Sequence, residues 1–255
     1  MKIQWLGTAA AEGWPAVFCR CDACMRALRR GGRDIRMRSG ALIDDTLLID
    51  LNPDLYAQKL RFGLDLHSVH DILITHNHTD HMQPDVLDLM SRVCAGEQME
   101  HVGIYGPSDA IQRTLPYIAY LDPHAVEAGD TLELQSGYRV TVLPALHSAK
   151  LGKFYLIEKG GKSILYAHDT DIFPDKAWEI LQKAVSKPID LVSLDCTNGP
   201  LPHDYIGHMG LAEDGVVIEK LKKLGLADGH TRFFCNHFSH NGHLLYDELR
   251  PLAAQ

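Results

Sequence analysis

The sequence predicts an α/β fold in which short buried strands alternate with amphipathic helices. Apolar runs alternate with helical patterns from end to end of the 255-residue chain, without internal repeats or low-complexity stretches. Hydrophobic residues make up 45% of the chain and charged residues 23%, which is enough to bury a sizeable core. We therefore expect one domain spanning residues 1–255.

The first half of the chain begins with a strand at about Ile3–Leu6, followed by a stretch rich in Gly and Ala. Asp44-Asp45 joins two apolar runs, Ala41–Ile43 and Thr46–Asp50, which predict the strands of a hairpin. A helix is expected after them, at Pro53–Arg61. Two more strands are then expected, a short buried one at Asp71–Thr75 and another at Val102–Tyr105. Further helices are expected at Pro84–Val93 and Ser108–Tyr120.

The second half continues the alternation, and its strands end just before metal-capable residues. Gly160-Gly161 predicts a hairpin. The expected strands are Tyr138–Pro144, Phe154–Glu158, Lys162–Ala167, Leu191–Asp195 and Arg232–Asn236, and the expected helices are Pro174–Val185 and Leu211–Leu224. His147, Asp169 and His237 each follow one of these strands, at the edge where α/β sheets usually expose their chemistry.

Four metal-capable side chains fall within six residues in His76-Asn77-His78-Thr79-Asp80-His81, on a turn between a strand and a helix. His76 and His78 can converge on one ion from an extended loop, while Asp80 and His81 point to a second ion nearby. Imidazole and carboxylate ligands suit Zn, Mn or Fe and leave positions open for water and substrate. Taken singly, the later His and Asp residues are weaker candidates, because each could cap an element or lie in the core.

This succession of His-x-His-x-Asp-His, an isolated His, an Asp and a final His resembles the metallo-β-lactamase superfamily over essentially the whole chain. The resemblance implies a four-layer αββα sandwich with two metal ions, Mn or Zn, at one edge. It implies that one ion is held by His76, His78 and His147, that the other is held by Asp80, His81 and His237, and that Asp169 bridges the two. His168 precedes Asp169 where the family more often has a small polar residue, so a role for His168 at the site stays open.

Cys19, Cys21 and Cys24 place three thiolates at C-x-C-x-x-C spacing, which suits a structural zinc with a fourth ligand from elsewhere in the chain. His240 is the candidate, because it lies three residues past His237 and could tie a zinc-binding loop at residues 19–24 to the C-terminal end. The alternative is three free cysteines on a mobile loop. With no apparent export signal, the cysteine pattern favours a reducing, cytoplasmic location.

The cysteine motif combined with the intact His motif resembles the phosphodiesterases of the carbon-phosphorus lyase pathway, which open cyclic phosphates of ribose phosphates. That resemblance implies hydrolysis of a small phosphodiester, in phosphonate metabolism, by a hydroxide that two metal ions activate. Asp80 and His208 are assigned to catalysis, His208 as the proton donor with His203 as its competitor. Thioester, lactone or RNA hydrolysis stays an alternative, as does a non-catalytic protein like those of pyrroloquinoline quinone biosynthesis.

The formal net charge of -8 argues against a surface that coats nucleic acid, which requires a basic footprint. No apolar run is long enough to span a bilayer. The expected partner is a small anionic phosphodiester, and a homodimer stays open. Six arginines between Arg26 and Arg38 could steer an anion, although a solvated basic face is the more common meaning of such a run.

Overall fold

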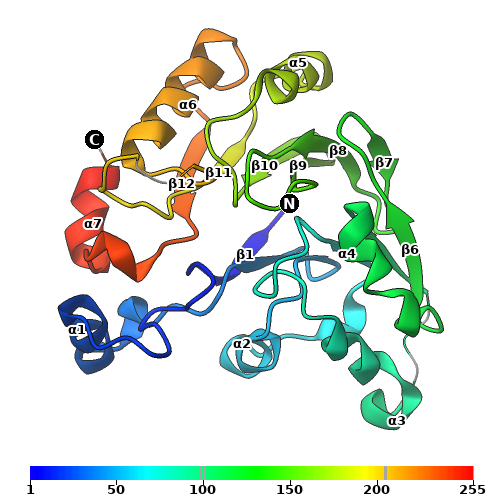
Figure 1. Cartoon of the computed structure of the whole chain (residues 1–255). Coiled ribbons are helices and arrows are strands. Elements are labelled where there is room, and N and C mark those ends of the chain that lie inside the picture. Colours follow the sequence, from blue (N-terminus) through cyan, green and yellow to red (C-terminus); the bar gives the residue numbers. More distant parts are fainter. Residues whose placement is uncertain (98, 100, 204–205, 255) are drawn as a thin grey trace.

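The computed structural model describes residues 1–97, 99, 101–203 and 206–254. Two six-stranded sheets lie face to face, and helices cover their outer faces (Figure 1). The first sheet runs in the order β1 (Ile3–Gly7), β2 (Gly40–Ile43), β3 (Leu47–Ile49), β4 (Asp71–Leu73), β5 (Val102–Gly106) and β6 (Leu121–Ala125). The second runs in the order β12 (Arg232–Asn236), β11 (Leu191–Asp195), β10 (Lys162–Ala167), β9 (Lys153–Lys159), β8 (Arg139–Pro144) and β7 (Thr131–Glu133).

Each sheet combines an antiparallel part with a parallel part. In the first sheet β1, β2 and β3 are antiparallel neighbours, and β3 to β6 run parallel. In the second sheet β7 to β10 form an antiparallel meander, and β10, β11 and β12 run parallel. The parallel strands of a sheet release their chains at one common edge, which is where side chains from distant segments can meet.

Three hydrophobic cores separate the four layers. The central core lies between the sheets, and the two outer cores lie between each sheet and its helices. The alternation of side chains along β9 shows this directly, because Tyr155 and Ile157 belong to the central core while Phe154 and Leu156 belong to the outer core. The expected four-layer αββα sandwich is confirmed.

The helices are α1 (Asp22–Arg30), α2 (Leu55–Phe62), α3 (Arg92–Ala95), α4 (Ser108–Gln112), α5 (Asp175–Ala184), α6 (Leu211–Lys223) and α7 (Tyr246–Ala253). Two expected helices are shorter than predicted. The helix expected at Ser108–Tyr120 ends at Gln112, and a separate 3₁₀ turn contains Pro116, which has no N–H to continue an α-helix. The segment expected as a helix at Pro84–Val93 is 3₁₀ up to Met90.

The helix α1, which the sequence did not predict, lies beside α7 (Figure 1). Arg26 pairs with Glu248, and Arg30 Nη2 lies 2.6 Å from Asp247 Oδ2. Two other arginines of the basic run also have partners. Arg36 stacks over the ring of Phe238, and Arg38 forms a salt bridge with Asp54. Arg26, Arg30 and Arg36 therefore hold the two ends of the chain together.

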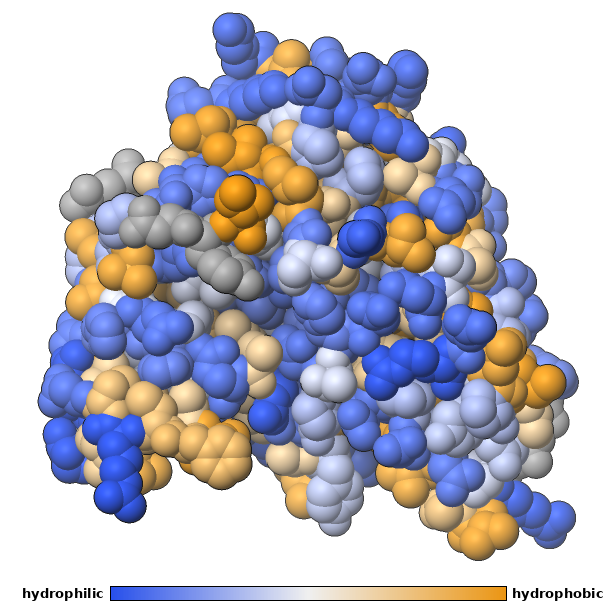
Figure 2. All heavy atoms as spheres, viewed as in Figure 1, coloured by the Kyte–Doolittle hydropathy of each residue, from blue (hydrophilic) through white to orange (hydrophobic). Residues whose placement is uncertain are grey.

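On the face drawn in Figure 2 hydrophilic side chains predominate, and hydrophobic ones form separate small patches. In the described part of the chain, every helix is too short or too polar to span a bilayer.

Candidate metal centre

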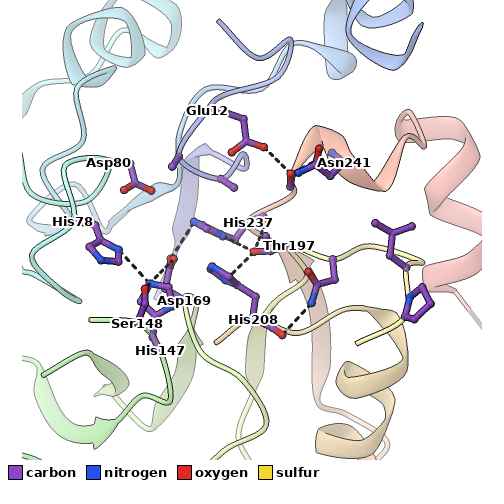
Figure 3. A pocket seen from close by; sticks show the side chains of 16 residues that line it. Glu12, His78, Asp80, His147, Ser148, Asp169, Thr197, His208, His237 and Asn241 are labelled. Atoms are coloured by element: carbon purple, nitrogen blue, oxygen red, sulfur yellow. Dashed lines mark hydrogen bonds and ion pairs between the residues drawn. The ribbon is translucent and has the colours of Figure 1, made fainter. Parts of the chain in front are cut away.

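The seven side chains expected to bind the active-site ions lie together where the strands end (Figure 3). His76, His78, Asp80 and His81 follow β4, and the other three residues follow β8, β10 and β12, as His147, Asp169 and His237. The structure thus brings together groups that are up to 161 residues apart, from His76 to His237.

The ligand atoms form two groups that share a carboxylate. Those of His76, His78 and His147 lie within 4.8 Å of one another, and so do those of Asp80, His81 and His237. Asp169 lies between the groups, with Oδ1 3.7 Å from His147 Nε2 and Oδ2 3.0 Å from the Nε2 atoms of both His81 and His237. This is the arrangement that the family resemblance implies.

Hydrogen bonds outside the cluster fix the orientation of the imidazoles. His81 Nδ1 lies 2.7 Å from Asp50 Oδ2, and His237 Nδ1 lies 2.8 Å from Thr197 Oγ1. His147 Nδ1 donates to the carbonyl oxygen of Gly207 at 2.9 Å. Each bond leaves the Nε2 atom of that ring directed at the cluster, which is how proteins commonly orient metal-binding histidines.

The donor set fits divalent cations. His147 Nε2 lies 3.2 Å from His78 Nδ1, and His81 Nε2 lies 3.3 Å from His237 Nε2. Among the described residues, no hydrogen-bond partner reaches the buried Nε2 of His76. Ring nitrogens that face one another in a buried site need a shared cation or proton, and imidazole and carboxylate ligands together suit Zn or Mn.

The pKa directions agree with this donor set. Burial lowers the pKa of His76 well below its usual value, and burial likewise lowers the pKa of His147, so both rings are neutral and able to coordinate. Burial opposes the charge of Asp169, yet His237 and His81 hold the pKa of its carboxyl well below the usual range. Burial also opposes a charge on His81, but Asp169, Asp80 and Asp50 raise its pKa well above the usual value. The carboxylates that favour a proton on His81 would equally favour a metal cation.

Three residues of the site adopt left-handed backbone conformations within two positions of the end of their strands. The φ angles are 65° at Asp50, 52° at Asp169 and 60° at His237. Such angles are uncommon for residues other than glycine and cost of order 1 kcal/mol each. The turns redirect the chain at the sheet edge, so that these side chains point into the site.

A pocket opens beside the cluster of metal-binding candidates (Figure 3). Of the two histidines considered as proton donor, His208 lines this pocket and His203 does not. His208 Nδ1 lies 2.9 Å from Asp195 Oδ2, and although burial opposes its charge, that carboxylate raises the pKa of His208 to about 9. His203 Nε2 instead lies 3.0 Å from Asp171 Oδ2. Sequence reasoning missed Asp195, because it is the last residue of a predicted strand and the other candidates were found just past their strands.

His168, whose role the sequence left open, is a buried core residue. Its Nδ1 lies 3.1 Å from Ser39 Oγ and its Nε2 lies 2.8 Å from Ser193 Oγ, so both nitrogens point away from the cluster. Burial lowers the pKa of His168 to about 3. The ring is therefore neutral, and it supports the turn that carries Asp169.

The four residues of the expected zinc site form a second cluster, separate from the first. The ligand atoms of Cys19, Cys21, Cys24 and His240 lie within 4.8 Å of one another. His240 Nδ1 lies 3.7 Å from Cys19 Sγ and 3.6 Å from Cys21 Sγ. Cys24 lies in the first turn of α1, so the cluster extends beyond a loop. Burial opposes ionisation of Cys21, but hydrogen bonds from the Cys24 backbone and His240 lower its pKa to about 6, which favours the thiolate.

Known proteins resemble this chain in sequence and fold. A model of the beta-lactamase superfamily domain matches residues 45–235. The crystal structure of a diphosphatase from the PhnP family is 27% identical, with a TM-score of 0.71, and the match covers 94% of this chain and 86% of that one.

Two more distant structures share the fold. Zinc-bound PqqB from Methylobacterium extorquens is 17% identical with a TM-score of 0.65, and the match covers 94% of this chain and 98% of that one. The short form of human tRNase Z is 18% identical with a TM-score of 0.63, covering 94% and 93%. A search of curated proteins gave no significant match.

The hydrogen bond between His81 and Asp50 generates a prediction. Asp50→Asn should weaken binding of zinc to the metal-free protein by about 10- to 100-fold, because the imidazole loses the carboxylate that orients it. Competition with a chelator measures the affinity. Asp45→Asn, at an exposed hairpin position, is the matched control and should bind as the wild type does. Equal affinities for Asp50→Asn and the wild type would contradict the assignment.

Proposed function

The chain belongs to the metallo-β-lactamase superfamily, a family of hydrolases, and we propose that it is a metal-dependent phosphodiesterase acting on a small phosphodiester. A ribosyl cyclic phosphate is one candidate substrate. The observation that carries the proposal is the pair of ligand groups that share Asp169. Paired sites of this kind suit the in-line displacement at phosphorus, in which attacking and leaving oxygens are both stabilised.

In this proposal His76, His78 and His147 hold one ion, Asp80, His81 and His237 hold the other, and Asp169 is shared. When bound, two divalent cations supply an activated water molecule and neutralise charge on the phosphate oxygens. Asp80 also lines the pocket, where its carboxylate can orient the attacking water. The polar residues around the cluster keep the imidazoles aligned, so that little reorganisation is needed during the reaction.

His208 is proposed to give a proton to the leaving group. Its ring lies on the pocket wall beside His147, with ring centroids 4.7 Å apart, and Asp195 orients it through Nδ1. A departing sugar alkoxide is a poor leaving group that needs protonation in the transition state. Although burial opposes its charge, Asp195 raises the pKa of His208 to about 9, so that the ring carries a proton that it can give at neutral pH.

A diphosphatase activity is the second candidate, because a diphosphatase of the PhnP family is 27% identical to this chain over most of its length. Both activities attack a phosphorus centre and differ in the leaving group, an alkoxide in one and a phosphate in the other. The likeness to tRNase Z and to PqqB concerns the fold alone, so RNA hydrolysis and a non-catalytic role rest on no specific observation.

Three further features complete the proposal. The active-site cations are Mn or Zn, and a structural zinc occupies the cysteine cluster. The proposed location is the cytoplasm, because a cluster of thiolates that binds zinc is typical of a reducing compartment. The whole chain acts as one domain, in phosphonate metabolism or a similar route that consumes phosphodiesters.

A substrate panel tests the proposed function. The protein, reconstituted with Mn or Zn, should hydrolyse bis(p-nitrophenyl) phosphate and a ribosyl cyclic phosphate with kcat/KM at least about 100-fold above a thioester and a lactone, because paired cations favour the phosphoryl transition state. Preference for the carbon esters would overturn the proposal. Preference for a nucleoside diphosphate sugar would favour the diphosphatase, and no hydrolysis at all would favour a non-catalytic role.

The acid role of His208 gives a second prediction. His208→Ala should lower kcat by about 100-fold or more for an alkyl phosphodiester, the usual contribution of a general acid, and by less than about tenfold for a nitrophenyl ester, whose leaving group needs no proton. His203→Ala, which removes a histidine outside the pocket, is the control and should affect the two substrates alike. Equal losses for the two substrates in His208→Ala would exclude the acid role.

A further inference from the structure

Part of the pocket lining is not used by the proposed chemistry, and we call it the second wall. It includes Glu12 and Asn241, which lie at one side of the site in Figure 3, together with Ser239, which contacts Glu12. The pocket measures about 560 Å³, within the range of pockets that enclose a small organic ligand. The second wall is therefore placed to contact the part of a substrate that extends from its reacting phosphate.

The charge of this wall is unusual for a pocket that receives an anion. Of the described residues that line the pocket, none is Lys or Arg. Glu12 adds a carboxylate to the lining, where His208, whose pKa, against the effect of burial, Asp195 raises to about 9, is a cationic side chain. Glu12 itself favours uncharged hydrogen-bond donors over an anionic group as its direct neighbours, because a carboxylate repels an anion.

The backbone holds Glu12 in place. The turn that carries it follows β1, and Phe238 N donates to Thr8 O at 2.8 Å while Ala10 N donates to Phe238 O at 3.0 Å. The carboxylate itself is anchored at one oxygen, because Ser239 Oγ donates to Glu12 Oε1 at 2.6 Å. The other oxygen, Oε2, has no hydrogen-bond partner among the described residues, and the side chain is 30% exposed. Glu12 thus offers a fixed acceptor to whatever occupies the pocket.

Glu12 also lies near the cysteine cluster, which suggests a different role. Its Oε1 lies 3.9 Å from His240 Nε2, too far for a hydrogen bond, and 3.3 Å from the backbone N of His240. A residue that only positioned His240 would need this one oxygen. The other oxygen, Oε2, has no part in that role, and Glu12 lines the pocket as well as the cavity beside Cys19 and His240.

We propose that Glu12 determines substrate specificity by accepting hydrogen bonds from hydroxyl groups. The substrate class is then a phosphodiester in which a sugar or polyol presents its hydroxyl groups to Glu12. A carboxylate is a strong acceptor for hydroxyl groups, and its hydrogen bonds are stronger than those of neutral acceptors. This inference rests on the proposed phosphodiesterase function and adds the recognition of the group attached to phosphorus.

Two probe substrates with one leaving group test the inference, uridine 5′-(p-nitrophenyl phosphate) and its 2′,3′-dideoxy analogue. The wild type should prefer the diol by about tenfold or more in kcat/KM, mainly through KM, the effect expected of a hydrogen bond to a charged group. Glu12→Gln should reduce this preference to less than about threefold. The same variant should tolerate an added 3′-phosphate on the probe better than the wild type does, because the repulsive charge is gone.

Glu219→Gln, the same change at an exposed position of α6, is the matched control and should keep the preference of the wild type. Zinc content and the melting temperature of Glu12→Gln show whether the cysteine cluster is intact. No preference for the diol in the wild type, or the same preference in Glu12→Gln, overturns the inference. Failure of the wild type to hydrolyse either probe and bis(p-nitrophenyl) phosphate would instead overturn the proposed phosphodiesterase function.

Discussion

The structure depends on the mutual attraction of buried carboxylates and imidazoles around one shared residue, Asp169. Its two oxygens face different histidines, with His147 on one side and His81 and His237 on the other. Five imidazoles gathered this closely, with ring nitrogens 3.2 and 3.3 Å apart, need positive charge between them. In the proposed function divalent cations would supply that charge without the repulsion that several protonated rings would bring.

The fold brings these charged groups together at a small cost in backbone strain. The parallel strands of both sheets end at one edge, so each ligand needs only a short turn to reach the site. The turns at Asp50, Asp169 and His237 are left-handed, and the three buried cores hold the strands that carry them. Local backbone strain of order 1 kcal/mol per residue is small beside the free energy that binding of structural metal ions contributes.

Much of this arrangement could be predicted from the sequence, because the candidate ligands lie in short motifs or just past predicted strands. The His motif and the residues just past each strand follow from spacing and from strand ends, and the thiolate spacing identifies the cysteine cluster. The partners that orient these groups leave weaker signals. Thr197 reaches His237 through a hydroxyl group 40 positions away, and Glu12 meets Ser239 across 227 positions. Such contacts depend on how the ends of the chain pack.

The pairing of α1 with α7 could not be predicted either, because it also depends on contacts between distant parts of the sequence. A run of arginines looks the same in sequence whether it faces solvent or the carboxylates of another helix. In this structure two of the arginines form salt bridges with Glu248 and Asp247 of α7. Pro116 shows the opposite case, in which one local residue overrides a pattern that otherwise favours a longer helix.

The most direct test of the account is anomalous diffraction from crystals of the protein grown with Zn or Mn, recorded at the absorption edge of the metal supplied. We predict anomalous density between His76 and His237 on both sides of Asp169, together with a zinc peak among Cys19, Cys21, Cys24 and His240. A peak at the cysteine cluster alone, with none beside Asp169, would contradict the central claim.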